Sequence, residues 1–201
     1  MVALTLAACA GPEPLTSPLP IAAARGLFAG AQVTVEGLVT VSTGTFDDGF
    51  ALADATGGIY VTRARGSALV VGERVRVAGR VVAPNGQTGL EPSAITRAGA
   101  GRTPTPLAVK TGAAGPATEG RLIAVRGQLT GGVIDDQPWG WKFYVDDGSG
   151  PLLVFIATPA RIDVRGLRAG LRLRVAGFSG RYEEHTELLP RGPHDISLLA
   201  D

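Results

Sequence analysis

Several residue types are scarce in this chain of 201 residues, and each scarcity excludes a class of protein. A single cysteine excludes an intrachain disulfide framework and any metal site built from several cysteines. Charged residues make up only 18% of the chain and the net charge is +1, so no overall attraction to polyanions is expected. No apolar run approaches the ~20 residues that a membrane-spanning helix requires.

Glycine and proline, in contrast, are abundant. The 29 glycines and 14 prolines disfavour long helices and suit short strands joined by turns. Hydrophobic residues make up 45% of the chain, which is enough apolar material for a packed core. The composition therefore favours an all-β globular protein.

The only cysteine, Cys9, lies in an apolar N-terminal stretch. Residues 6–9 (LAAC) resemble the lipobox of bacterial lipoproteins, in which a signal peptide is cut before a cysteine that carries a lipid. The resemblance implies an extracytoplasmic protein that is lipid-anchored to the cell envelope through Cys9. Two features depart from the pattern, because only eight residues precede Cys9 and none of them is Lys or Arg. The alternative is an apolar N-terminus on a cytosolic protein.

The rest of the chain contains an internal duplication. Three blocks recur in the same order, namely residues 33–40 (VTVEGLVT) with 123–130 (IAVRGQLT), 54–61 (DATGGIYV) with 147–154 (DGSGPLLV), and 71–79 (VGERVRVAG) with 169–177 (AGLRLRVAG). This repeat predicts two similar domains. We divide the chain into a leader and Pro-rich tether (1–24), a first domain (25–98), a linker (99–116) and a second domain (117–201).

Within each domain the apolar residues recur with a period of two, which is typical of strands buried on one face. This pattern predicts five strands per domain, at 32–41, 50–54, 58–63, 73–83 and 87–96, and at 121–130, 141–147, 151–156, 170–179 and an interrupted 183–198. Short helical turns are expected near 64–71 and 159–168. The predicted core includes Val35, Ile59, Val75 and Val77 in the first domain and Val125, Val154, Leu173 and Val175 in the second.

A glycine in the middle of each first strand, Gly37 and Gly127, together with the hairpin at residues 50–61, resembles the nucleic-acid-binding OB-fold. In that fold the glycine lets the first strand bend and serve both sides of a barrel. The resemblance implies two tandem five-stranded Greek-key barrels with little helix. It indicates a fold more than a function, because OB-folds have many unrelated roles.

Residues suited to catalysis are few. The chain has two histidines and no nucleophile elbow, phosphate-binding loop or zinc-protease motif, so we expect no enzyme and no cofactor. Glu183, His185 and Glu187 share one strand face, and paired acids follow the first strand of each domain (Asp47, Asp48, Asp135 and Asp136). Metal binding is the less favoured interpretation of both features, because solvated strands and turns commonly carry such residues.

Strand alternation selects a candidate binding face on the second domain. If Phe143 and Val154 point inward, the residues that point outward on the same two strands are Lys142, Tyr144, Leu153 and Phe155. Tyr144 and Phe155 are suited to stacking on bases, and Lys142 and Arg126 to contacting phosphates. The first domain offers Tyr60 at the corresponding place. Packing against the neighbouring domain is the alternative role of these aromatics. Barrel packing is the expected role of Trp139 and Trp141, and the alternative is that an exposed loop aromatic contacts a polymer or sugar.

The local charge balance opposes tight DNA binding. Residues 25–98 carry seven arginines and six acids, and residues 117–200 carry nine arginines, Lys142 and ten acids. Basic stripes on the fourth strands (Arg74, Arg76 and Arg80; Arg172 and Arg174) favour either phosphate contacts or ordinary ion pairs. We therefore predict weak binding of single-stranded nucleic acid, with a structural or protein–protein interaction module of the envelope as the alternative.

Overall fold

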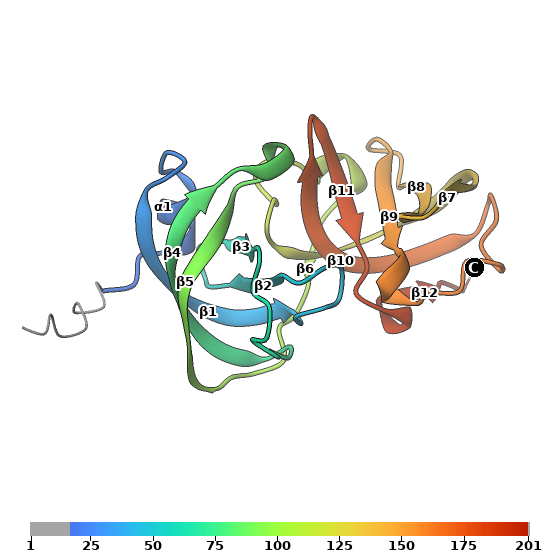
Figure 1. Cartoon of the computed structure of the whole chain (residues 1–201). Helices are drawn as coiled ribbons and strands as arrows, with labels where there is room; N and C mark the ends of the chain where they lie inside the picture. The colour runs from blue at the N-terminus through green and yellow to red at the C-terminus, as the bar shows by residue number, and fades with distance from the viewer. Residues whose placement is uncertain (1–16, 201) are drawn as a thin grey trace, which may run out of the picture.

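The computed structural model describes residues 17–200, which form a nearly all-β protein (Figure 1). The first half of the chain contains α1 (Ile21–Arg25), β1 (Gln32–Val41), β2 (Phe50–Ala53), β3 (Gly58–Val61), β4 (Glu73–Val82), η1 (Pro84–Gly86) and β5 (Gly89–Ala100). The second half contains β6 (Leu107–Ala108), η2 (Thr111–Ala113), β7 (Leu122–Asp136), β8 (Gly140–Asp146), β9 (Leu152–Ala157), η3 (Thr158–Ala160), β10 (Arg172–Tyr182), β11 (His185–Leu189), η4 (Pro193–Asp195) and β12 (Ile196–Leu198). Among the described residues, no helix has the length and apolar character needed to cross a membrane.

The strands form two barrels of the same topology. The first is closed in the order β1-β2-β3-β5-β4, with β4 pairing back onto β1. The second follows the equivalent order β7-β8-β9-β11-β10 and is closed by the pairing of β10 with β7, while β6 and β12 extend it at the edges. The prediction of an all-β chain with two tandem OB-like barrels is confirmed.

The strand registers confirm the internal repeat residue by residue. Val35 pairs with Val77 across β1 and β4, and the aligned Val125 pairs with Val175 across β7 and β10. A Cβ atom on Gly37 would lie 2.6 Å from the carbonyl oxygen of Ala53, and one on Gly127 would lie 2.7 Å from that of Asp146. Both mid-strand glycines therefore sit where the chain approaches its neighbouring strand too closely for a side chain.

Each barrel encloses its own apolar core. All eight core residues predicted from the sequence are buried, and they divide between the two cores as expected. The short helix α1 adds Ile21 and Ala24 to the first core, although the sequence placed these residues in the tether. Residues 64–71 form no helix, and only η3 at Thr158–Ala160 is helical near the second expected turn, so that expectation is wrong for the first barrel.

The two barrels lie side by side and share polar and aromatic contacts (Figure 1). Arg25 on the first barrel forms an ion pair with Glu119, with 3.0 Å between Nη2 and Oε1. The ring of Phe178 on β10 packs against Tyr60 of β3, with 5.4 Å between centroids. Arg191 also donates a hydrogen bond of 2.9 Å from Nη1 to the carbonyl of Thr40. These contacts cover part of the outer surface of both barrels.

Candidate functional site

The predicted face of β8 and β9 has the predicted orientation. Phe143, Val145, Leu152, Val154 and Ile156 are buried in the second barrel, so the residues between them point outward. In the β8–β9 pairing Lys142 lies opposite Phe155, and Tyr144 lies opposite Leu153. The hairpin therefore brings these four candidate residues onto one surface, although it does not pair the two aromatic rings directly.

Lys142 is not available as an unpaired cation. Its Nζ lies 2.8 Å from Oδ2 of Asp136 and 5.7 Å from the centroid of the Phe155 ring. The hydrogen bond to Asp136 is the main reason that the pKa of Lys142 is raised above its ordinary value. One of the paired acids thus balances the charge that we expected to contact phosphate.

The remaining candidates on this hairpin differ in exposure. Tyr144 is 40% exposed on the outer surface of β8. Leu153 is half-buried, and Phe155 is half-buried at a cleft between the two barrels that also contains Phe178 and Tyr60. Tyr144 is therefore open to a ligand from solution, whereas Phe155 faces the junction of the domains.

The expectation that Tyr60 occupies an open binding face is wrong. Tyr60 is only 7% exposed, because the side of β3 that points away from the first core is covered by Phe178 of the second barrel. Its hydroxyl donates a 2.5 Å hydrogen bond to Oδ1 of Asp47. Burial is the main reason that the pKa of Tyr60 is raised far above its ordinary value, and the bond to Asp47 adds to the effect.

Arg126 lies in a cluster of arginines on the outer face of β7 and β10. It is exposed and pairs in register with Arg174, and Arg172 follows two positions away on the same strand face. None of these three side chains forms an ion pair with residues 17–200. In the first barrel Glu36 occupies the position equivalent to Arg126, and it forms ion pairs with Arg74 at 3.5 Å and with Arg76 at 2.9 Å.

The same contrast holds across the whole of each barrel. Each of the seven arginines between residues 25 and 98 has a carboxylate partner. In the second domain, six arginines have no ion-pair partner within the described part of the chain, namely Arg121, Arg126, Arg161, Arg168, Arg172 and Arg174. Of these, Arg121 donates a hydrogen bond to the carbonyl of Thr56. Although the net charges of the two domains are similar, unpaired positive charge is concentrated on the second barrel.

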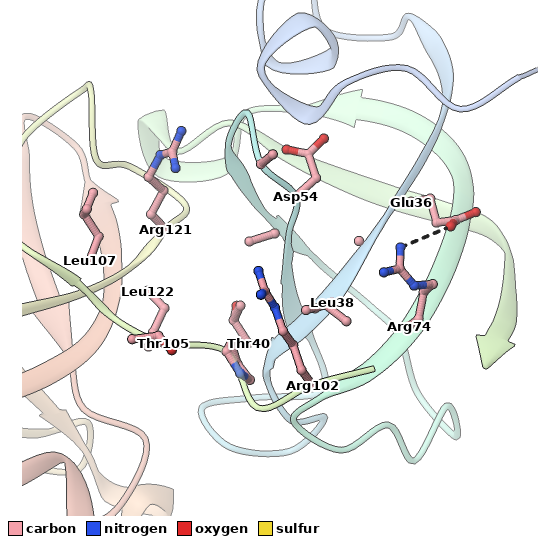
Figure 2. A pocket seen from close by; sticks show the side chains of 14 residues that line it. Glu36, Leu38, Thr40, Asp54, Arg74, Arg102, Thr105, Leu107, Arg121 and Leu122 are labelled. Carbon is pink, nitrogen blue, oxygen red and sulfur yellow. Dashed lines mark ion pairs between the residues drawn. The ribbon is translucent and has the colours of Figure 1, made fainter. Parts of the chain in front are cut away.

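A groove of about 560 Å³ lies between β1 and β2 of the first barrel, the segment that follows β5, and Leu107, Arg121 and Leu122 of the second half of the chain (Figure 2). Figure 2 shows the Arg102 side chain between Leu38 and Thr40, and the ion pair of Arg74 with Glu36 at one side. Asp54 also lines the groove. Two acids and three arginines line this groove, so neither sign of charge dominates it.

The acidic loops have structural roles. Asp47 accepts hydrogen bonds from the backbone of Gly49 and from Tyr60, and Asp48 forms an ion pair with Arg65. Asp135 accepts a hydrogen bond from the Gln137 backbone. No three His, Cys, Asp or Glu residues between 17 and 200 lie close enough together to hold a metal ion.

The loop between β7 and β8 extends beyond the barrel. Trp139 at its tip is 71% exposed, so the expectation that it packs on the barrel is wrong, whereas Trp141 packs against the second core. The pairing of β7 with β8 shifts register between Thr130 and Ile134. Beyond this shift Ile134 and Trp139 are exposed, whereas Trp141 still contacts the core.

One difference between the two repeats indicates the arginine cluster at the level of sequence. The aligned first strands differ at one charged position, with Glu36 in one repeat and Arg126 in the other. Glu36 is the only acid in residues 33–40, and it forms ion pairs with Arg74 and Arg76 of the fourth strand. With arginine in place of glutamate at the equivalent position of the second repeat, the fourth-strand arginines of that repeat lack this partner. The alignment of the two repeats therefore predicts that this outer face is neutralised in the first barrel and basic in the second.

No protein-family model and no curated protein sequence matches this chain. Among solved structures, the hypothetical protein ygiW from E. coli is 20% identical, with 42% of this chain and 92% of that chain covered at a TM-score of 0.35. The p204 HINb domain is 14% identical, with 86% and 100% covered and a TM-score of 0.41. A single-stranded DNA binding protein from Thermus aquaticus is 16% identical, with 87% and 95% covered and a TM-score of 0.32. At these values the similarity carries no argument about function.

Proposed function

We propose that this chain is a non-enzymatic binding protein that holds single-stranded nucleic acid on the outer face of its second barrel. The observation that carries the proposal is the register that sets Arg126 opposite Arg174, beside Arg172, with no carboxylate partner among residues 17–200. Arginines that face solvent without a partner can neutralise phosphates, and phosphate neutralisation supplies most non-specific nucleic-acid affinity.

Tyr144 supplies a stacking surface on the neighbouring strand. It pairs with Thr130 of β7, four residues along the strand from Arg126, which corresponds to about 13 Å. An extended single strand running along β7 would therefore meet arginines first and an aromatic ring further along. Base stacking on one ring tolerates any sequence, so we expect binding without base specificity.

The proposed binding is weak and sensitive to salt. The described arginine cluster is small, and Asp146 of β8 lies opposite Gln128 on the same outer surface. Each phosphate contact contributes about 0.7 to the slope of log K against log salt for a single strand. We therefore expect a slope of magnitude about two, arising from Arg126, Arg172 and Arg174.

A fluorescence titration of a labelled oligo-dT tests the proposal at two salt concentrations. Arg172→Ala should weaken binding about tenfold at low salt, the equivalent of one charge-assisted contact. Arg74→Ala is the matched control, because Arg74 is the equivalent residue of the first barrel and is already neutralised by Glu36. The absence of wild-type binding at low salt, or equal losses in the two variants, would refute the proposal.

A protein-interaction module is the second candidate, and the exposed Trp139 favours it. Trp139 and Ile134 place apolar surface on the arm formed by β7 and β8, beyond the second core. Exposed aromatic residues are common at protein interfaces. If oligo-dT does not bind, this arm becomes the preferred site, and Trp139→Ser should then abolish binding of a protein partner.

We also propose that the protein is lipid-anchored outside the cytoplasm. The support is the LAAC motif ending in Cys9, which lies outside the described residues. Cys9→Ser should release the protein from membranes, as measured by fractionation of cells that express it. Membrane association that persists in the Cys9→Ser variant would refute the lipid anchor.

A further inference from the structure

A small cleft of about 220 Å³ lies between the two barrels and is rich in aromatic side chains. It is lined by the rings of Phe46, Tyr60, Phe155, Phe178 and Tyr182. Phe178 holds the cluster together, because its ring centroid lies 5.4 Å from that of Tyr60 and 6.4 Å from that of Phe46. Its volume is below the roughly 300–1,000 Å³ of sites that enclose a drug-sized ligand, so the cleft suits a group of a few heavy atoms.

The cleft also contains a carboxylate without a partner. Glu187 on β11 lies beside Leu153 of β9 and opposite Gly180 of β10. It is partly buried, and no hydrogen bond or ion pair joins its side chain to residues 17–200. Burial raises the pKa of Glu187, while the nearby charges of Lys142 and His185 oppose that rise. A partly buried carboxylate is costly to keep without a compensating cation or donor.

Two basic residues near Glu187, Lys142 and Arg181, have other partners. Lys142 is held by Asp136 at 2.8 Å. Arg181, which lines the cleft, donates its Nε–H to the carbonyl of Glu183 at 2.7 Å and pairs with Glu184 at 3.2 Å. The cleft therefore combines aromatic faces with a carboxylate that forms no ion pair or hydrogen bond with another described residue.

We propose that this cleft binds a small organic ammonium ion. Aromatic rings attract a cation to their faces, and the attraction grows when the cation is shielded from water, as it would be between the two barrels. Glu187 supplies the counter-charge, and the size of the cleft limits the ligand to the ammonium group and its substituents. This site is separate from the arginine cluster on β7 and β10, and its ligand has the opposite charge.

Choline chloride is the probe that we would use with the full chain, and 3,3-dimethylbutan-1-ol is its uncharged analogue of the same shape. Calorimetric titration in the millimolar range should show saturable binding of choline. The neutral analogue should bind at least about tenfold more weakly, since it lacks the charge that both the rings and Glu187 recognise.

Two variants test whether binding occurs in this cleft. Glu187→Gln keeps the shape of the side chain and removes the charge, and it should weaken choline binding by at least about tenfold. Tyr182→Leu removes a rim ring that is largely exposed, so it tests the aromatic contribution without disturbing a core. Glu183→Gln is the matched control, because Glu183 lies on the same β10–β11 hairpin but its side chain is exposed and does not line the cleft.

Loss of binding in the Glu187 and Tyr182 variants, with unchanged binding in the Glu183 variant, would support the site. Three results would overturn it: no saturable choline binding, equal binding of the neutral analogue, or unchanged binding in Glu187→Gln. Melting curves of each variant distinguish lost binding from a lost fold. None of these results depends on whether oligo-dT binds to the arginine cluster.

Discussion

Arg126 of β7 lies directly opposite Arg174 of β10, at the position where the first barrel places Glu36 opposite Arg76. Like charges that face each other across neighbouring strands destabilise a sheet, whereas opposite charges stabilise it. The second barrel therefore carries an unfavourable pair that its own duplicate lacks. Such a local cost is typical of sites where function conflicts with stability.

The first prediction follows from this conflict. Arg126→Glu gives the second barrel the charge pattern of the first, so it should raise the free energy of unfolding by about 0.2–1 kcal/mol. The same variant should lose oligo-dT binding. Urea denaturation and the fluorescence titration measure the two effects on one protein preparation.

The reciprocal variant is the control for this prediction. Glu36→Arg breaks the ion pairs with Arg74 and Arg76, so the first barrel should lose stability. If Arg126→Glu lowers stability instead, the like-charge pair is not a source of strain in the folded protein.

The second prediction separates the two outward aromatics of the second barrel. Tyr144→Ala should weaken oligo-dT binding by about 1–3 kcal/mol, because one stacking surface is removed. Phe155→Leu should leave that affinity unchanged, because Phe155 lines the cleft between the barrels. Equal losses in both variants would show that the nucleic acid crosses β9 as well as β7 and β8.

The third prediction concerns the junction of the barrels. Glu119→Gln leaves the partly buried guanidinium of Arg25 without its counter-ion, although Arg25 still donates a hydrogen bond to the Glu119 carbonyl. Removal of one member of a buried ion pair costs about 3–5 kcal/mol, and we expect the lower end of that range. Arg165→Gln is the control, because its ion pair with Asp163 is exposed and should contribute less than about 1 kcal/mol.

The two barrels could be predicted because each strand has a local pattern of alternating apolar residues, and because the same pattern occurs in both repeats. The period of two identified which side of each strand is buried, and the repeat fixed the matching registers of Val35 and Val125. Trp139 was misplaced because it lies in the loop between β7 and β8 and is exposed, and strand alternation does not show where a strand ends.

The candidate site was harder to predict than the fold, because its residues depend on contacts between distant parts of the chain. Tyr60 points away from its own core as the alternation required, but that outward side is covered by Phe178 of the other barrel. Lys142 is outward as well, but Asp136 on the neighbouring strand neutralises it. A period of two separates inside from outside within one barrel and cannot indicate what packs against the outside.

The last prediction uses a turn carboxylate that both repeats contain. Asp147 accepts a 2.8 Å hydrogen bond from the Thr111 hydroxyl. This hydrogen bond connects η2 to the turn between β8 and β9. The equivalent Asp54 accepts a 2.9 Å hydrogen bond from the backbone N–H of Ile21, and this bond connects α1 to the first barrel. Each carboxylate thus ties the segment that precedes its barrel to the barrel itself.

Hydrogen bonds from Ser149 and then Thr111 lower the pKa of Asp147 from its ordinary value of 3.8 to about 2. A carboxylate with a depressed pKa in the folded state stabilises the protein above its unfolded pKa, and the contribution is lost as the pH falls through the folded pKa. The stabilisation by Asp147 should therefore be complete above about pH 4 and decline between pH 4 and pH 2.

Melting temperatures of the wild type and Asp147→Asn, measured from pH 5 to pH 2, test this prediction. The variant should melt at a lower temperature at pH 5, and the difference should shrink towards pH 2, where the wild-type carboxyl also becomes neutral. Thr111→Val should reproduce part of the loss at pH 5, and it should add little to Asp147→Asn, because the two side chains share one hydrogen bond. A difference that stays constant across this range would show that the charge of Asp147 does not stabilise the attachment of η2.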